Sequence, residues 1–226
     1  MLLPDPTTAL QEPDGLLAAG GALTTPWLLS AYRRGIFPWF GNDDKYILWW
    51  CPSRRAVLEP GTMRITRSLA KRIRNAGFDL SMDRAFPAVI AGCSEPRGDV
   101  AGTWITPDMR GAYIDLHEQG HAHSVEVWYQ GRLVGGLYGI AVGRVFCGES
   151  MFSRMADASK VAFHALQRQL ADWSFRLIDC QIMNPHLASL GVYEISREDF
   201  LQELAEAVTA PELTRRWSFD IATATF

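Results

Sequence analysis

The stretch that decides the fold opens with Val145-Phe146-Cys147-Gly148-Glu149-Ser150-Met151-Phe152-Ser153-Arg154 and closes with Leu177-Ile178-Asp179-Cys180-Gln181. Each end has the alternation of a β-strand, and the segment between them has the apolar spacing of a helix that begins near Asp157. Within each strand an acid and a second polar residue stand where the pattern otherwise calls for apolar side chains. A strand, a helix and a returning strand with polar residues on both strands are the layout of a site.

The acids of these two strands are the first candidates for chemistry. The period of a strand sends Asp179 and Gln181 to one face, so a carboxylate and an amide point the same way. If the two strands are neighbours in one sheet, Glu149 converges with Asp179. The alternative is that both acids lie at strand ends in solvent, but their apolar flanks favour burial. We therefore expect Asp179 to face an apolar cavity.

The surrounding sequence predicts a meander. Two turns, Gln130-Gly131 and Gly143-Arg144, separate three alternating segments, which predicts two hairpins. Thr106-Pro107-Asp108 is a helix start with a cap and a first-turn proline. Three antiparallel strands, a helix and a returning strand are typical of a GNAT-like acyltransferase fold. We expect an α+β protein with a small aromatic-rich N-terminal domain (residues 1–62) and a GNAT-like catalytic domain (residues 63–226), whose mostly antiparallel sheet is flanked by helices.

Composition excludes several classes of protein. Hydrophobic residues make up 48% of the 226 residues, which is enough for a sizeable core, and no apolar run is long enough to cross a bilayer. The first residues lack the basic segment of a secretory signal. The four cysteines are widely spaced and have no histidines at metal-ligand spacing beside them. We expect a cytoplasmic protein with reduced thiols, no metal and no membrane contact.

The basic charge is local. Residues 54–74 contain seven Lys or Arg and one acid, a net charge of +6, although the whole chain carries −3. On a helix capped by Thr66, the side chains of Arg67, Lys71 and Arg74 share one face. A solvated charged face is the usual fate of such a helix, but the scarcity of neutralising acids favours contact with phosphates.

Some familiar chemistry is absent from the sequence. It contains no phosphate-binding loop, no dinucleotide fingerprint and no nucleophile elbow. The turn before Asp157 has no glycine, which disfavours coenzyme A, because a fold of this type would cradle the pyrophosphate with a glycine-rich turn there. The aromatic residues between Phe37 and Trp50 are either a small core or a platform on which a nucleobase stacks.

Five separate motifs carry a resemblance to a known family. They are Gly15-Leu16-Leu17-Ala18-Ala19-Gly20-Gly21, Tyr32-Arg33-Arg34-Gly35-Ile36-Phe37-Pro38-Trp39-Phe40, Gly102-Thr103-Trp104-Ile105-Thr106, the run from Phe146 to Arg154, and Leu177 to Gln181. In this order they resemble leucyl/phenylalanyl-tRNA-protein transferases. The resemblance implies an enzyme that takes Leu or Phe, and less often Met, from aminoacyl-tRNA. It would join them to proteins with an N-terminal Arg or Lys and so mark these for degradation.

The resemblance also implies roles for individual residues. Asp179, Gln181 and Glu149 would be catalytic, with Asp179 acting as a general base or as an electrostatic clamp and Glu149 lying near the cationic acceptor. The side-chain pocket would consist of Leu137, Phe146, Phe163, Leu166 and Ile178, for which ordinary core packing is the alternative. The tRNA 3′-adenosine would contact Trp49 and Trp104. Phosphates would contact Arg54, Arg55, Arg64, Arg67, Lys71 and Arg74.

The physical chemistry of the transfer agrees with this reading. An aminoacyl ester is already activated, so the reaction requires no ATP, metal or other cofactor. The attacking α-amine has an ordinary pKa of about 7.7 to 8.0, so a useful fraction is neutral near pH 7. Holding amine and ester together supplies most of the catalysis. We expect a monomer whose partners are aminoacyl-tRNA and the acceptor protein. The alternatives are a GNAT-fold N-acyltransferase with another acyl donor and a non-catalytic tRNA-binding module.

Overall fold

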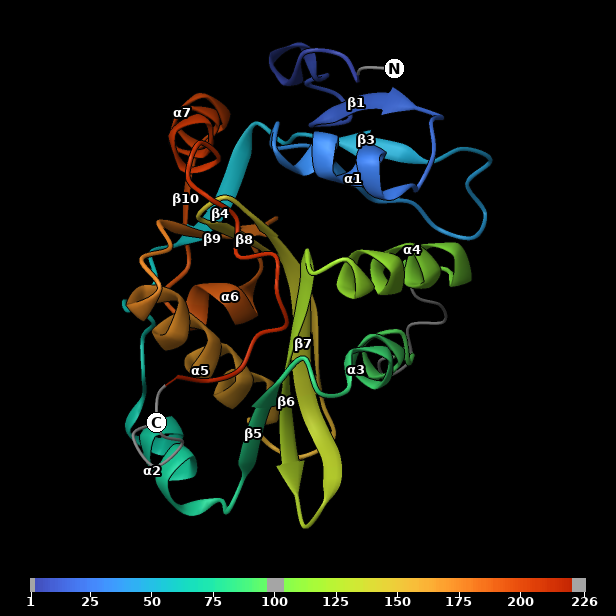
Figure 1. The fold of residues 1–226 in the computed structure, drawn as a ribbon. Coiled ribbons are helices and arrows are strands. Elements are labelled where there is room, and N and C mark those ends of the chain that lie inside the picture. Colours follow the sequence, from blue (N-terminus) through green and yellow to red (C-terminus); the bar gives the residue numbers. More distant parts are fainter. Residues whose placement is uncertain (1–2, 97–103, 221–226) are drawn as a thin grey trace.

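Two sheets organise the chain (Figure 1). The computed structural model describes residues 3–96 and 104–220, and in this part a three-stranded sheet lies at one end of a seven-stranded sheet. The small sheet is antiparallel, with the order β1 (Leu16–Ala19), β3 (Leu48–Trp50) and β2 (Phe37–Pro38). Helix α1 (Thr25–Tyr32) packs against it, and a 3₁₀ turn, η1 (Pro6–Thr8), precedes it.

The large sheet has the strand order β10-β4-β9-β8-β7-β6-β5. Its strands are β4 (Arg54–Leu58), β5 (Asp79–Met82), β6 (Ala122–Tyr129), β7 (Arg132–Val142), β8 (Val145–Ser153), β9 (Leu177–Gln181) and β10 (Tyr193–Ser196). Every neighbouring pair is antiparallel except β8 and β9, which are parallel. The expected α+β class with a mostly antiparallel sheet is confirmed.

The two predicted hairpins are confirmed, and the backbone shows why their turns form. Gln130 and Gly131, between β6 and β7, both have positive φ, as a tight hairpin turn requires. Gly143, between β7 and β8, also has positive φ, and a Cβ there would overlap the carbonyl oxygen of Ala207. That second turn therefore requires glycine for its conformation and for its close contact with a helix.

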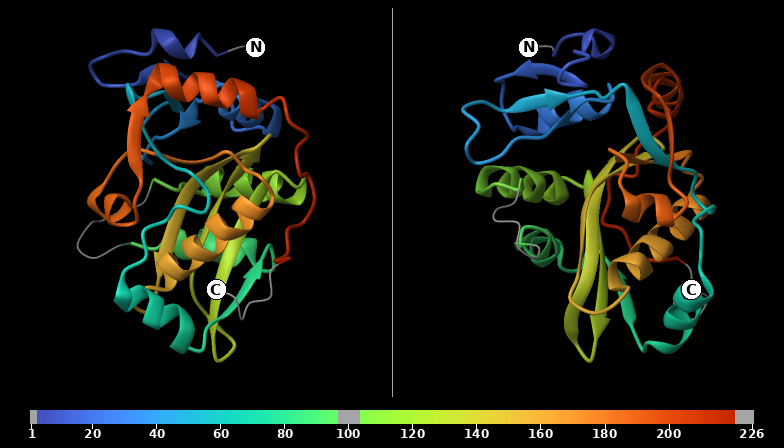
Figure 2. Two further views of the ribbon diagram at one scale, coloured as in Figure 1. Left: turned by 90° about the vertical axis from the view of Figure 1, so that its left-hand side faces the viewer. Right: turned by 180° about the vertical axis from the view of Figure 1, so that it is seen from behind.

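Helices cover both faces of the large sheet (Figures 1 and 2). One face carries α3 (Phe86–Cys93) and α4 (Pro107–Glu118), and the other carries α5 (Ala158–Asp172) and α6 (Pro185–Ser189). The helix start predicted at Thr106 is confirmed, because its hydroxyl accepts the backbone N–H of Met109. Two apolar cores result, one on each side of the sheet.

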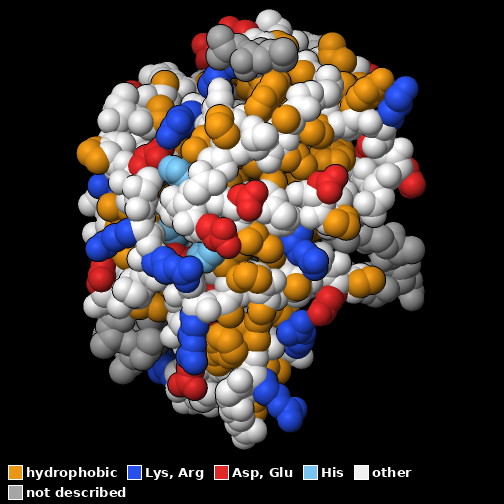
Figure 3. Space-filling view, turned by 45° about the vertical axis from the view of Figure 1, so that its right-hand side comes forward, with side chains coloured by type: hydrophobic (Ala, Val, Ile, Leu, Met, Phe, Trp, Pro, Cys, Tyr) orange, Lys and Arg blue, Asp and Glu red, His pale blue; other side chains and the backbone are white. Residues whose placement is uncertain are grey.

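The remaining helices lie at opposite ends of the molecule. Helix α2 (Arg67–Asn75) lies at the end of the large sheet farthest from the small sheet, whereas α7 (Arg197–Ala207) lies beside the small sheet (Figures 1 and 2). On the face shown in Figure 3, hydrophobic side chains gather over the upper part, where the small sheet lies. Among the described residues, no helix is both long and apolar enough to cross a membrane.

Two segments were not anticipated from the sequence. Strand β4, which falls within the predicted N-terminal domain, pairs in the large sheet between β10 and β9. The chain beyond α7, residues 211–220, crosses the large sheet beside α5, and we call it the C-terminal strap (Figure 2). Strand β4 therefore lies next to the acid-bearing strand β9, and the strap contributes to the core between the large sheet and α5.

Candidate active site

A cavity of 930 Å³ opens where β8 and β9 separate. The two strands pair in parallel from Val145 opposite Leu177 to Cys147 opposite Asp179. Beyond that point the cavity is lined by Gly148 to Met151 of β8 and by Cys180 to Met183, which form the end of β9 and the two residues after it. The parting of two central strands therefore makes the site, and the residues after the last paired position face into it.

The cavity has an apolar part made by predicted residues. Leu137 of β7, Phe146 of β8, and Phe163 and Leu166 of α5 line it. Ile178 is fully buried in the core against α5 and is not among the residues that line the cavity. The structure thus brings four of the five predicted side chains together in the lining of the cavity.

Asp179 is held in a buried ion pair. Its Oδ1 accepts hydrogen bonds from Arg55 Nε at 2.7 Å and from the backbone N–H of Gln181 at 2.9 Å. Its Oδ2 accepts one from Arg55 Nη2 at 2.6 Å. The side chain is completely buried and is not part of the cavity wall, so the expectation that it faces the cavity is wrong. Both oxygens are engaged, and the carboxylate acts on its surroundings through these partners.

Arg55 has a structural place in this arrangement. Its guanidinium lies between the rings of Phe37 and Phe200, 4.7 and 4.5 Å from their centroids, and Nη1 donates to the carbonyl oxygen of Gly35. The side chain is 1% exposed. A buried, paired guanidinium has no free face for an RNA phosphate, so the predicted phosphate contact by Arg55 is corrected to an ion pair with Asp179.

A β-bulge directs Gln181 into the cavity. Ala56 of β4 pairs with Gln181 and Val57 pairs with Asp179, which leaves Cys180 as an extra residue in β9. Gln181 has a φ of 62°, a conformation that is rare for a residue with a side chain. Asp179 stabilises it by accepting its N–H. The amide Nε2 then donates to Glu149 Oε1 at 2.8 Å.

Of the two predicted catalytic acids, Glu149 is the one that reaches the cavity. Tyr32 and Gln181 donate to its Oε1 and Tyr113 donates to its Oε2, each at 2.8 Å. Burial raises the pKa of its carboxyl to about 7, although the hydrogen bonds from the three neutral donors act in the opposite direction. Glu149 therefore exchanges a proton near neutral pH, whereas Asp179 is bound to a permanent cation.

Sequence reasoning missed both tyrosines of this network. Tyr32 ends α1 and Tyr113 belongs to the buried stripe of α4, and their hydroxyl oxygens lie 2.5 Å apart. Burial raises the pKa of both hydroxyls well above the usual range, so both stay protonated. The signal available in the sequence was a tyrosine at a core position, because a buried hydroxyl requires a hydrogen-bond partner.

The tryptophans are arranged differently from the prediction. Trp49 is fully buried, stacks on Trp27 and donates its indole N–H to the carbonyl oxygen of Gly20. Trp104 lines the cavity, as does Trp39, whose side chain is exposed. The predicted adenosine contact by Trp49 is corrected to a role in the core, whereas Trp39 and Trp104 lie at the cavity.

The remaining predicted basic residues are exposed. Arg64 lies before α2, Arg67, Lys71 and Arg74 lie on it, and Arg54 begins β4. The helix is capped as predicted, with the Thr66 hydroxyl accepting the N–H of Leu69. In the part of the chain that the structure describes, no group of acids, histidines and cysteines is arranged to hold a metal ion.

Comparison with known protein families identifies relatives along most of the chain. A family model described as leucyl/phenylalanyl-tRNA protein transferase matches residues 57–205, and the N-terminal domain model of the same name matches residues 21–53. A leucyl/phenylalanyl-tRNA–protein transferase of Thiobacillus denitrificans is 57% identical over 96% of this chain and 95% of its own length. One of Chromohalobacter salexigens is 59% identical over 92% of this chain and 81% of its own length.

Solved structures resemble the chain only distantly. A GCN5-related N-acetyltransferase from Kribbella flavida aligns with a TM-score of 0.41 at 12% identity, covering 72% of this chain and 57% of its own. The L-PGS structure from Bacillus licheniformis aligns with the same score and identity, covering 66% of this chain and 48% of its own.

The buried ion pair predicts a large loss of stability on removal of its acid. Asp179→Ala leaves the Arg55 guanidinium buried without a counter-charge, and we expect the free energy of unfolding to fall by about 3 to 5 kcal/mol. Urea denaturation followed by circular dichroism measures it. Glu206→Gln, which breaks an exposed pair with Arg176, serves as the control and should cost less than about 1 kcal/mol. Equal losses in the two variants would contradict the assignment.

The raised pKa of Glu149 predicts a pH-dependent difference between the wild type and Glu149→Gln. Because the folded pKa is about 7 and the unfolded one about 4.5, the wild type loses stability relative to the variant as pH rises through this window. From pH 4.5 to pH 8 we expect the difference in unfolding free energy to change by roughly 2 to 4 kcal/mol in favour of the variant. Urea titrations at both pH values measure it. A difference that does not depend on pH would contradict the assignment.

Proposed function

The chain belongs to the leucyl/phenylalanyl-tRNA protein transferase family, and from this premise we propose that it transfers Leu or Phe, and less often Met, from aminoacyl-tRNA to proteins that begin with Arg or Lys. It is an aminoacyltransferase. The observation that carries the proposal is a cavity whose apolar wall adjoins the hydrogen-bonded pair of Glu149 and Gln181. Transfer takes place in the cytoplasm on a monomer and marks the acceptor for degradation.

The donor amino acid occupies the apolar part of the cavity. Its side chain packs against Leu137, Phe146 and the α5 residues Phe163 and Leu166. Burial of a leucine or phenylalanine side chain contributes about 1.5 to 3 kcal/mol, which is the energy available for selecting apolar amino acids. The 3′-adenosine stacks against the indoles of Trp39 and Trp104, and such stacking is worth about 1 to 3 kcal/mol per base.

The reaction is an aminolysis of the ester. The acceptor α-amine attacks the ester carbonyl carbon, the new amide bond forms, and the bond from that carbon to the ribose oxygen breaks. The amine loses a proton and the departing ribose oxygen gains one. Glu149 lies in the cavity wall and burial raises the pKa of its carboxyl to about 7, so it accepts the proton and can return one to the leaving oxygen.

The neighbours of Glu149 support this role. Gln181 donates to the same oxygen as Tyr32 and fixes the orientation of the carboxylate. The Tyr32 and Tyr113 hydroxyl oxygens also lie within hydrogen-bonding distance of each other, so either hydroxyl can donate to the other when it does not donate to Glu149. The network therefore accommodates both the ionised and the protonated carboxyl. Asp179 serves as the clamp that positions Gln181, because both of its oxygens already accept hydrogen bonds.

Two carboxylates are available for the cationic side chain of the acceptor. Glu149, when ionised, attracts a positive acceptor residue towards the cavity. Glu95 also lines the cavity, and its side chain is 56% exposed in an ion pair with Arg154. An incoming Arg or Lys can exchange for Arg154 at little cost, because exposed ion pairs are weak. Negative charge at the rim thus favours N-terminal Arg or Lys.

The basic helix α2 extends contact to the body of the tRNA. Arg67, Lys71 and Arg74 are exposed, and Arg64 lies just before them. Lys and Arg side chains on a face of this kind bind phosphates without reading the base sequence. The helix lies at the end of the large sheet farthest from the small sheet (Figure 1), so the tRNA would run along the molecule.

A transfer assay tests the proposed function. Leu-tRNA labelled in the amino acid is incubated with the chain and with two acceptor proteins that differ only in an N-terminal Arg or Glu. We expect label in the Arg acceptor alone, since the acids at the cavity repel a second acid. Tight tRNA binding without transfer would favour a non-catalytic module, and transfer from acetyl-CoA would favour another acyl donor.

The basic helix predicts a change in salt dependence. Replacing Arg67, Lys71 and Arg74 by Gln removes up to three phosphate contacts, so the slope of log affinity against log salt should become shallower by about 2 to 3. Filter binding of Leu-tRNA at several salt concentrations measures this slope. Arg176→Gln, at an exposed arginine already paired with Glu203 and Glu206, is the control. An unchanged slope in the triple variant would remove α2 from the tRNA contact.

A further inference from the structure

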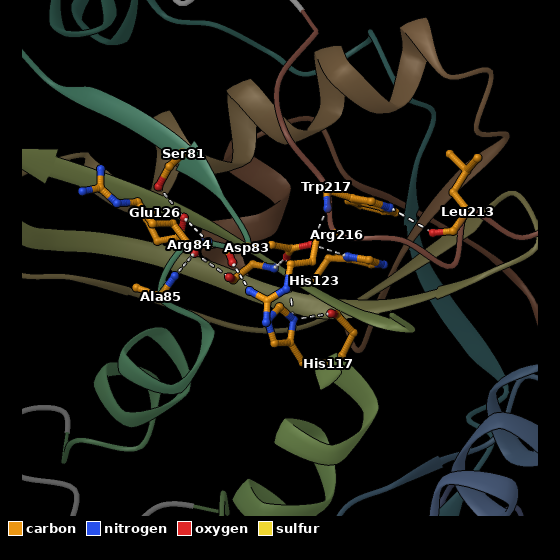
Figure 4. Close-up of polar contacts among 12 residues, drawn as sticks. Ser81, Asp83, Arg84, Ala85, His117, His123, Glu126, Leu213, Arg216 and Trp217 are labelled. Carbon is orange, nitrogen blue, oxygen red and sulfur yellow. Dashed lines mark hydrogen bonds and ion pairs between the residues drawn. The ribbon is translucent and has the colours of Figure 1, made fainter. Parts of the chain in front are cut away.

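The C-terminal strap is anchored to the large sheet at Asp83. This residue has a φ of 53° and a side chain that is 1% exposed. Its Oδ2 accepts the backbone N–H of Trp217 at 2.7 Å and the Nδ1–H of His123 at 2.8 Å, while Oδ1 accepts the N–H of Ser124 at 2.9 Å (Figure 4). Arg216 also donates to the Asp83 carbonyl oxygen. A single buried carboxylate therefore fixes the strap against β6.

This anchor places the ring of Trp217 in the core behind the cavity. The indole stacks on His123 with centroids 3.6 Å apart and planes 3° apart. Trp173 and Phe175 pack against it edge-on, with centroids 4.9 and 5.8 Å away. The ring is 2% exposed. Trp217 is thus held by its backbone, by a stacked ring and by two edge contacts.

The same ring supports the wall of the cavity. Its centroid lies 5.9 Å from that of Phe146, which lines the cavity. Phe146 also lies over Gly139 of β7, where an added Cβ would come within 2.6 Å of its Cζ. The phenyl ring is therefore confined between the β7 backbone, Trp217 and the cavity. Its position, and hence the depth of the apolar wall, depends on Trp217.

We propose that Trp217 is a specificity-determining positioning residue, which sets the preference between Leu and Phe by fixing Phe146 against the donor side chain. The inference rests on the proposed function, because it assumes that the donor amino acid occupies this part of the cavity. Trp217 lies outside residues 57–205, which the family model matches. The strap thus adds a layer to the pocket from a part of the chain beyond that match.

Trp217 would affect the Leu-to-Phe preference through the volume of the pocket that is available to the donor side chain. A phenylalanine side chain is larger than a leucine side chain, and a pocket with a fixed wall discriminates by whether the larger group fits. Removing Trp217 leaves space behind Phe146, into which the phenyl ring can retreat. The pocket deepens, so the variant accommodates Phe better relative to Leu. A purely structural loss would lower both transfers by the same factor and leave their ratio unchanged.

The test measures the ratio of kcat/KM for Leu-tRNA and Phe-tRNA in competition on one acceptor. In Trp217→Ala we expect the ratio to move towards Phe by about five- to tenfold, within the range that small volume differences produce. Trp217→Phe keeps an aromatic ring and serves as the milder variant if Trp217→Ala does not fold. Trp128→Phe is the control, since that indole donates to Ser81 on β5 and is not among the cavity residues.

A double-mutant cycle with Phe146→Leu tests whether Trp217 acts on the Leu-to-Phe preference through Phe146. If Trp217 acts through Phe146, the change in ratio caused by Trp217→Phe shrinks when Phe146 is already replaced. An unchanged ratio in folded Trp217 variants, or effects that are additive with Phe146→Leu, would overturn the inference while the proposed function stands. If the wild type transfers neither amino acid, the proposed function fails and this inference fails with it.

Discussion

The buried ion pair between Arg55 and Asp179 is the interaction on which the site depends. Moving both charges out of water is costly, and the pair persists because its geometry is bidentate and Nη1 of Arg55 also donates to the Gly35 carbonyl oxygen. Phe37 and Phe200 lie on either side of the guanidinium. The pair therefore joins β4 and β9 to the small sheet and to α7. A strand that is bulged beside a cavity is held in place by this connection.

The ion pair also gives the two acids of the site, Asp179 and Glu149, different environments. Asp179 has a permanent cation as its partner, whereas Glu149 has three neutral donors and a pKa raised to about 7 by burial. Two carboxylates in one site with such different environments take different roles. The pair fixes the backbone of Gln181, and the side chain of Gln181 fixes Glu149. Asp179, which does not reach the cavity, thus fixes through Gln181 the position of Glu149, which does.

Much of the fold could be predicted from the sequence, but the partners of the buried polar groups could not. Turn residues and alternation were enough to predict the hairpins, and Thr106 with Pro107 was enough for the start of α4. The sequence marks Arg55 as one more arginine in a basic segment, because its acid lies 124 residues away. The tertiary pairing that buries it leaves no local signal. The prediction for the tryptophans is wrong for a related reason, since only the packing of the small sheet decides that Trp49 is buried and Trp39 is exposed.

The bulge at Cys180 shows why strand parity was insufficient at the site itself. In a regular strand, Asp179 and Gln181 would point the same way and both would face the cavity. The extra residue and the positive φ of Gln181 break this relation, so the carboxylate faces Arg55 while the amide faces Glu149. An ionised aspartate inside the cavity would lie against its apolar lining at a cost in desolvation. Because of the extra residue, the strand keeps the charged carboxylate in the core and places the neutral amide of Gln181 in the cavity wall.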